Sequence, residues 1–271
     1  MSELSRRILS GALYVGLLSF GIWYHSYSFI ALFYLLMVGS MYEFHRLIGL
    51  NSVFPYLIST LMFVFVNLWN ADDFSLEKTP AYTGILLFLS FFASFISVLF
   101  HTKVRAVSQL GKIFLSIMYI GVPFTLMVLV PFINHDFHYI HSTILGIFVL
   151  IWTGDTFAYI TGKLFGRHKL FPAISPNKTV EGFAGGLLFT FIAAWIMSKL
   201  SGSPGTVHWF VFAGIVGVFG VLGDLIESMF KRQAGVKDSG TLLPGHGGLL
   251  DRLDSIIFSI PFVFIYLILV L

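Results

Sequence analysis

The chain has 271 residues, of which 57% are hydrophobic and only 11% are charged, and its mean hydropathy is +0.89. A soluble globular domain carries about 25% charged residues, so this composition excludes a water-soluble protein and predicts an integral membrane protein. The net charge is only +3, and cysteine is absent, which excludes disulfides and thiolate metal sites. Alternating ten-residue strand patterns are also absent, so helices are expected rather than a barrel.

Apolar runs of about 17–25 residues, the length that crosses a bilayer, recur along the whole chain. The first follows Arg6 and Arg7, like the start of a signal peptide, but it is long and no small-residue cleavage site follows, so we expect a retained helix. The third run is short and contains polar residues. We therefore predict an all-α polytopic membrane protein with about nine transmembrane helices, near residues 8–25, 28–47, 54–70, 81–100, 112–132, 143–161, 177–199, 208–230 and 254–271.

The distribution of lysine and arginine predicts how these helices are oriented. If the N-terminus is cytoplasmic and nine helices alternate, only Lys78 and Lys199 fall on the outer side. Such a bias agrees with the positive-inside rule, so the C-terminus is expected outside and the polar stretches 162–181 and 228–254 in the cytoplasm. The residues on the cytoplasmic side are Arg6, Arg7, Arg46, Lys103, Arg105, Lys112, Lys163, Arg167, Lys169, Lys178, Lys231, Arg232, Lys237 and Arg252.

Carboxylates lie within or at the edge of the apolar runs, at Asp155, Asp224 and Glu227. A carboxylate at the centre of a membrane helix costs about 2.5–3.5 kcal/mol on insertion scales, so each is expected in a polar cavity, on a cation, in an internal ion pair or at the interface. Helical spacing places Asp224, Glu227, Ser228 and Lys231 on one face. Asp251 and Asp254 repeat the pattern at the start of the last helix. Two helices that present carboxylates at similar depth predict a site for a hard divalent cation such as Mg²⁺.

Cations and glycines follow the eighth predicted helix. Lys231, Arg232 and Lys237 form either an ordinary cluster for anionic lipid head groups or part of a phosphate site. Gly245, Gly247 and Gly248 flank His246, where a glycine-rich backbone can bend tightly and turn its N–H groups toward anions.

A second polar stretch runs from residue 174 to residue 186. Ser175 and Pro176 fit the N-cap and first position of a helix, so we predict that a helix begins here, with Lys178 and Thr179 in its first turn as a phosphate site. Glu181 is expected to pair with Lys178 or to point toward the metal region.

The sequence from residue 155 to residue 254 resembles the phosphatidate cytidylyltransferase (CDP-diacylglycerol synthase) family. The blocks Asp155–Tyr159 and Ser175–Gly182 match the family's upstream motifs. The main signature, S-x-x-K-R-x4-K-D-x-G-x-x-x-P-G-H-G-G-x-x-D-R-x-D, is met without departure by Ser228, Lys231, Arg232, Lys237, Asp238, Gly240, Pro244, Gly245, His246, Gly247, Gly248, Asp251, Arg252 and Asp254.

The resemblance implies that CTP and phosphatidic acid react to give CDP-diacylglycerol and pyrophosphate, with Mg²⁺ and with K⁺ as a second cation. It also implies a homodimer. The positive-inside bias suggests a bacterial inner membrane, and membrane lipids but no nucleic acid are expected as partners. Residues 1–271 would form one membrane domain, in which 1–135 supply scaffold or dimer contacts and 143–271 the catalytic helices and cytoplasmic loops.

On this reading a lipid phosphate oxygen attacks the α-phosphorus of CTP in line, and positioning and charge neutralisation supply the catalysis. The expected metal ligands are Asp224 and Asp251, then Asp254 and Glu227, with Asp155 in a supporting or second-cation role. The expected catalytic residues are Lys231, Arg232, Lys237, Asp251 and His246. Substrate contacts are expected from Ser175, Lys178, Thr179, Glu181, Ser228, Lys231, Arg232, Lys237, Gly247, Gly248 and Arg252.

Two other functions remain open at this point. A CTP-dependent lipid-alcohol kinase of the polyprenol or phytol type would transfer the γ-phosphate instead. An ion or anion transporter would use the buried carboxylates as its pathway, but it would spread polar residues through the full membrane depth, whereas here they gather at the cytoplasmic end.

Overall fold

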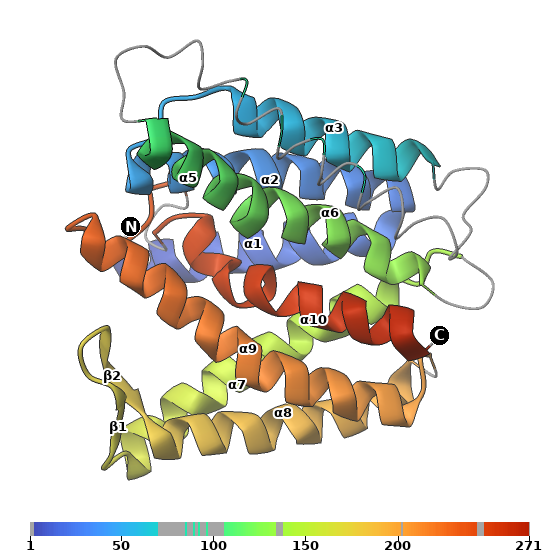
Figure 1. Cartoon of the computed structure of the whole chain (residues 1–271). Coiled ribbons are helices and arrows are strands. Elements are labelled where there is room, and N and C mark those ends of the chain that lie inside the picture. The colour runs from blue at the N-terminus through green and yellow to red at the C-terminus, as the bar shows by residue number, and fades with distance from the viewer. Residues whose placement is uncertain are drawn as a thin grey trace.

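The computed structural model describes residues 3–69, 106–133, 138–201, 203–242 and 247–270, together with the single positions 85, 89, 92 and 96. The described part is a bundle of helices with one small hairpin (Figure 1). Counting the continuous segment 106–132 as one, it contains eight helices. Apart from those four single positions, the predicted span at 81–100 lies outside the described residues, as do Pro244, Gly245 and His246.

The helices follow the predicted apolar runs closely. Most of them begin or end within a few residues of the predicted bounds. Five are long and apolar enough to cross a membrane: those at Ser26–Ile48, Ala106–Phe132, His141–Phe165, Val180–Leu200 and Thr206–Gln233. The elements are α1 (Glu3–Tyr24), α2 (Ser26–Ile48), α3 (Phe54–Trp69), α5 (Ala106–Ser116), α6 (Val122–Leu129), α7 (His141–Phe165), α8 (Val180–Leu200), α9 (Thr206–Gln233) and α10 (Asp254–Val270).

The segment 106–132 is the central helix of the bundle. Its apolar window is 83% buried, whereas the windows of the other four long helices are 28–39% buried, so this helix is surrounded by protein and reads as apolar on all sides. A π turn at Ile117–Gly121 joins α5 to α6. Pro123 lies two residues after this turn and has no N–H to donate to it, which accounts for the change in hydrogen-bond pattern at this position.

Helices α7 and α8 pack closely through small residues. A Cβ atom added at Gly186 would lie 2.8 Å from the backbone oxygen of Gly154, and one added at Gly182 would lie 2.8 Å from that of Ala158. Small residues four apart allow the backbones of two membrane helices to approach each other. This packing fixes the position of the hairpin that connects the two helices.

The connection between α7 and α8 corrects the prediction for residues 175–182. No helix begins at Ser175; residues Ser175–Thr179 form strand β2, which pairs antiparallel with β1 (Lys169–Phe171). Helix α8 begins at Val180 instead, with Thr179 as its N-cap: the Thr179 hydroxyl accepts a hydrogen bond from the Gly182 N–H at 3.1 Å. Lys178 is therefore held by a strand rather than by a first helical turn.

Thr179→Val is expected to lower the free energy of unfolding by about 1 kcal/mol, the usual cost of losing an N-cap oxygen. Thr179 is 7% exposed, and valine keeps its shape while removing the acceptor. Thermal unfolding in detergent micelles measures the change. Thr179→Ser is the matched control and should unfold close to wild type, because it retains the hydroxyl; equal unfolding temperatures for the valine variant and wild type would contradict the capping role.

Candidate active site

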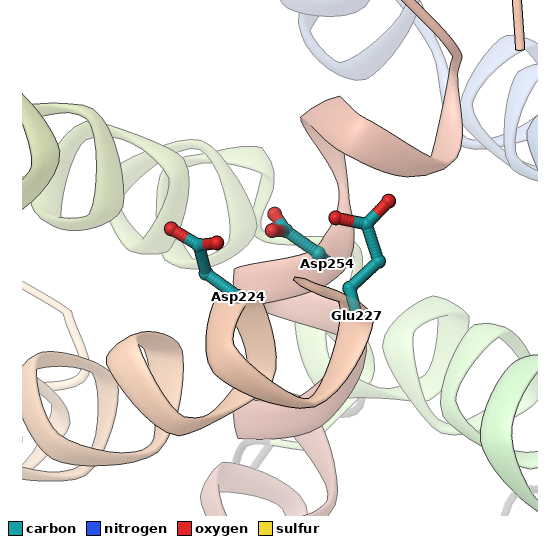
Figure 2. A group of neighbouring side chains, drawn as sticks. All are labelled: Asp224, Glu227 and Asp254. Atoms are coloured by element: carbon teal, nitrogen blue, oxygen red, sulfur yellow. The ribbon is translucent and has the colours of Figure 1, made fainter. Parts of the chain in front are cut away.

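Three carboxylates from two helices lie together where α9 meets α10. Asp224 and Glu227 lie one turn apart on α9, and Asp254 is the first residue of α10. One ligand oxygen from each lies within 4.8 Å of the others, and in Figure 2 the Asp254 carboxylate lies between those of Asp224 and Glu227. Glu227 and Asp254 are buried, and Asp224 is partly exposed. We call these three side chains the acidic triad.

Helices α9 and α10 approach closely enough to bring these three carboxylates together. A Cβ atom at Gly223 would lie 2.5 Å from the backbone oxygen of Asp254, so only glycine next to Asp224 lets the two helices meet at this depth. Three buried or half-buried carboxylates repel one another unless cations balance them. The surrounding side chains supply those cations.

Lys231 neutralises two carboxylates at once. Its Nζ lies 2.6 Å from Glu227 Oε2 and 2.7 Å from Asp251 Oδ1. The side chains of all three are largely buried, with exposed fractions of 13% for Lys231, 1% for Glu227 and 8% for Asp251. The predicted polar face of the helix is thus confirmed, because Glu227 and Lys231 are i and i+4 partners.

Asp251 is held outside the triad by the loop that precedes α10. It lies on a short 3-10 turn, Leu250–Arg252, and accepts hydrogen bonds from the Gly248 N–H at 2.7 Å and from the Ser239 N–H at 3.0 Å. Burial acts to raise the pKa of Asp251, but the hydrogen bonds, those of Lys231 first, outweigh burial and hold its pKa below the usual value. Asp251 is therefore a carboxylate at neutral pH.

The hairpin brings a second cation to the triad. Lys178, on β2, places its Nζ 2.6 Å from Asp224 Oδ2. Ser228 donates to the other oxygen of Asp224 at 3.2 Å. Lys178 and Ser228, which lie far apart in sequence, therefore meet at one carboxylate.

Glu181 turns away from the triad and braces the hairpin. Its carboxylate accepts hydrogen bonds from the backbone N–H groups of Arg167 and His168, and lies 2.6 Å from His168 Nδ1. Neither predicted partner, Lys178 or the metal region, is found beside it. Its contribution is to hold the segment between α7 and β1 against the start of α8.

The remaining predicted site residues line the same end of the bundle. Arg232 donates from Nε to the Ile174 carbonyl at 3.5 Å, which joins the end of α9 to the hairpin. Lys237 and Arg252 are exposed, and Ser175 is half-buried at the start of β2. Asp155 is exposed on α7 and lines a narrow cavity between α7, α8 and α9, with Asp224 and Lys178 among the charges that act on it.

Two side chains that the sequence reading overlooked also lie at this site. Glu43, on α2, is 1% exposed and contacts the loop before α10. Tyr119, on the π turn, has a buried hydroxyl without a hydrogen-bond partner among the described residues, and the triad carboxylates act on it electrostatically. A carboxylate inside an apolar run was the available signal for Glu43, the same signal that singled out Asp155.

Comparison with known proteins gives a consistent result. The chain matches the model of the cytidylyltransferase family over residues 5–270. It is similar to the phosphatidate cytidylyltransferase of Bacillus subtilis, with 36% identity in an alignment of 279 positions that covers 98% of each chain. It also resembles the phosphatidate cytidylyltransferases of Staphylococcus saprophyticus, 48% identical over 156 residues, and Staphylococcus epidermidis, 46% identical over 147 residues. The matched segments span 57% and 56% of those two relatives.

Proposed function

The chain belongs to the cytidylyltransferase family, and we propose that it transfers the cytidylyl group of CTP to phosphatidic acid. The observation that carries the proposal is the 98% coverage of the Bacillus subtilis phosphatidate cytidylyltransferase at 36% identity. The site supports it, because lysines from β2 and α9 and a cluster of carboxylates meet at the end of a helical bundle. The lysines can bind anionic phosphates, and the carboxylates can bind a divalent cation.

The acidic triad fits a hard divalent cation, and we propose Mg²⁺. The donor set consists of carboxylate oxygens, which Mg²⁺ prefers, and Glu227 Oε1 is buried without a hydrogen-bond partner among the described residues. A buried carboxylate oxygen left in this state is costly unless a cation or water satisfies it. Asp224, Glu227 and Asp254 would hold the ion, and Asp251 would join them by releasing Lys231. When bound, Mg²⁺ supplies positive charge that offsets repulsion between the phosphates.

The chemical step needs no protein nucleophile. An ionised phosphate oxygen of phosphatidic acid forms a bond to the α-phosphorus of CTP, and the bond from that phosphorus to the β-phosphate bridging oxygen breaks, so that pyrophosphate leaves. Lys178, Lys231, Arg232 and Lys237 would bind the anions and keep the reacting groups aligned, which is where catalysis of phosphoryl-type transfer resides. Ser175, Thr179, Ser228, Gly247, Gly248 and Arg252 would shape the substrate pocket.

Further parts of the proposal rest on the sequence alone. Asp155 would serve K⁺ as a second cation or support the triad, and His246 would contribute to the nucleotide loop. We also propose a homodimer, with residues 1–135 as scaffold or dimer contacts.

We propose that nine helices cross a bacterial plasma membrane, with the N-terminus and the active site in the cytoplasm. The lysine and arginine bias supports this orientation. So does the arrangement in Figure 1, where the N-terminus, the hairpin and the C-terminal end of α9 lie at one end of the bundle and the C-terminus at the other.

CTP labelled separately at the α- and γ-phosphates tests the function. With purified protein, Mg²⁺, phosphatidic acid and a polyprenol as the competing acceptor, the α label should enter the lipid and the γ label should leave as pyrophosphate. Entry of the γ label into a lipid alcohol would identify a kinase instead. Absence of label from lipid in either case, together with ion flux in proteoliposomes, would support a transporter.

A further inference from the structure

Glu43 connects the N-terminal half of the chain to the active-site loop. Its Oε2 atom accepts hydrogen bonds from the Ser239 hydroxyl at 3.0 Å and from the Leu250 N–H at 2.9 Å. Its Oε1 atom is buried and has no hydrogen-bond partner within the described part of the chain. A polar group is expensive to bury unless its contacts compensate for the lost water, so the position requires an explanation.

Two glycines of the active-site loop, Gly240 and Gly248, leave the space that this carboxylate occupies. A Cβ atom added at Gly240 would collide with Glu43 Oε1, and one added at Gly248 would collide with Glu43 Oε2 and with the Ser239 hydroxyl. Gly247 adopts φ +83°, a left-handed conformation that favours glycine. The glycines of this loop are thus explained in part by α2, and not only by an approach to phosphate.

The same loop segments hold Asp251. Ser239, which donates its hydroxyl to Glu43, also donates its N–H to Asp251 at 3.0 Å, and Gly248 donates to Asp251 at 2.7 Å. Asp251 in turn binds Lys231, which binds Glu227 of the triad. A continuous set of hydrogen bonds and ion pairs therefore runs from α2 to the acidic triad.

We propose that Glu43 is a positioning residue, which holds residues 239–240 and 248–250 on α2 so that Asp251 keeps its orientation toward Lys231 and the triad. Glu43 contacts no reacting atom. The inference rests on the proposed function, because it assigns to Glu43 the orientation of a residue in the proposed metal and phosphate site. On this proposal α2, in the N-terminal part of the chain, supports the active site directly.

Three variants test the proposal in the full-length protein. Glu43→Ala removes both acceptors, Glu43→Gln keeps one carbonyl acceptor, and Ser40→Ala is the matched control. Ser40 lies three residues earlier on α2, is fully buried, and its hydroxyl has no hydrogen-bond partner among the described residues. Ser239→Ala adds a milder variant, because it deletes only the hydroxyl bond and retains the N–H that Asp251 accepts.

Two measurements distinguish positioning from a general loss of stability. The Mg²⁺ concentration for half-maximal turnover should rise about 10- to 100-fold in Glu43→Ala, the usual effect of removing a group that orients a metal ligand. Ser239→Ala should change in the same direction by less, Glu43→Gln should recover most of the loss, and Ser40→Ala should match wild type. Hydrogen exchange of the Ser239 and Leu250 amides, which donate to Asp251 and to Glu43, should accelerate in Glu43→Ala and not in Ser40→Ala.

Unchanged Mg²⁺ dependence and unchanged exchange in both Glu43→Ala and Ser239→Ala would overturn the inference. If Glu43→Ala does not yield folded protein, Ser239→Ala and Glu43→Gln decide by the same two measurements. The Asp251→Ala variant distinguishes an error in the positioning role of Glu43 from an error in the proposed metal and phosphate site. An inactive Asp251 variant beside a normal Glu43 variant rejects only the positioning role, whereas an active Asp251 variant rejects the proposed site.

Discussion

Asp224→Asn is expected to lower the turnover number by about 10²- to 10³-fold, the range found when one charged or donor group is removed from a preorganised site. Asp224 is the triad member that also binds the hairpin, through the 2.6 Å ion pair with Lys178. Asparagine keeps the size of the side chain and an oxygen for the Ser228 hydroxyl, but removes the charge that a cation and Lys178 share. Initial rates of CDP-diacylglycerol formation, measured over a range of Mg²⁺ concentrations, give the effect.

Ser228→Ala is the control for this experiment. It removes the 3.2 Å hydrogen bond to Asp224 but no charge, and should cost far less activity. Asp251→Ala should abolish turnover, because Asp251 is one of the two carboxylates that bind Lys231. Membrane insertion and expression should remain intact. Near-wild-type rates in Asp224→Asn at every Mg²⁺ concentration would remove Asp224 from the metal site.

Lys231→Met is expected to destabilise the protein by about 3–5 kcal/mol, since removal of one partner leaves the other charges buried and unpaired. Glu227 and Asp251, with exposed fractions of 1% and 8%, both bind its Nζ within 2.7 Å. Methionine retains most of the side-chain volume, so the loss should reflect charge rather than a cavity. Thermal unfolding in detergent micelles measures it, and turnover should fall as well.

A charge-balanced double variant provides the control. Adding Glu227→Gln to Lys231→Met removes one of the two unpaired carboxylates and should recover much of the unfolding temperature. Turnover should not recover, because the triad has lost a ligand and the site a cation. If Lys231→Met unfolds at the wild-type temperature, the two ion pairs contribute no stability and the electrostatic account of this site is wrong.

The part of the site that depends on one helix was predictable from the sequence. Asp224, Glu227 and Lys231 share a face because helical periodicity is local, and the apolar runs around them define α9. The family resemblance, carried by residues 155–254, is confirmed by the match over residues 5–270. The number of membrane crossings and their orientation stay predictions.

The parts that depend on distant pairing were not predictable. Ser175 and Pro176 have the residue types of a helix start, but Thr179 offers a competing N-cap, and the pairing of β2 with β1 decides between them. Proline is tolerated at the edge of a two-stranded sheet. Glu43 is separated by 196 and 207 residues from the two groups it binds, and no local pattern reports such contacts.

The lysines of this site have a consequence for how its ligands bind. Lys178 and Lys231 each hold a carboxylate, so a phosphate that draws either lysine away exposes a negative charge at the same moment. A phosphate that binds at this site therefore replaces a carboxylate as the partner of a lysine, and does not bind to an unpaired lysine. By thermodynamic linkage, a nucleotide that raises the affinity for the divalent cation must itself be bound more tightly by the same factor when the cation is present. The protein would thus acquire its two charged ligands cooperatively.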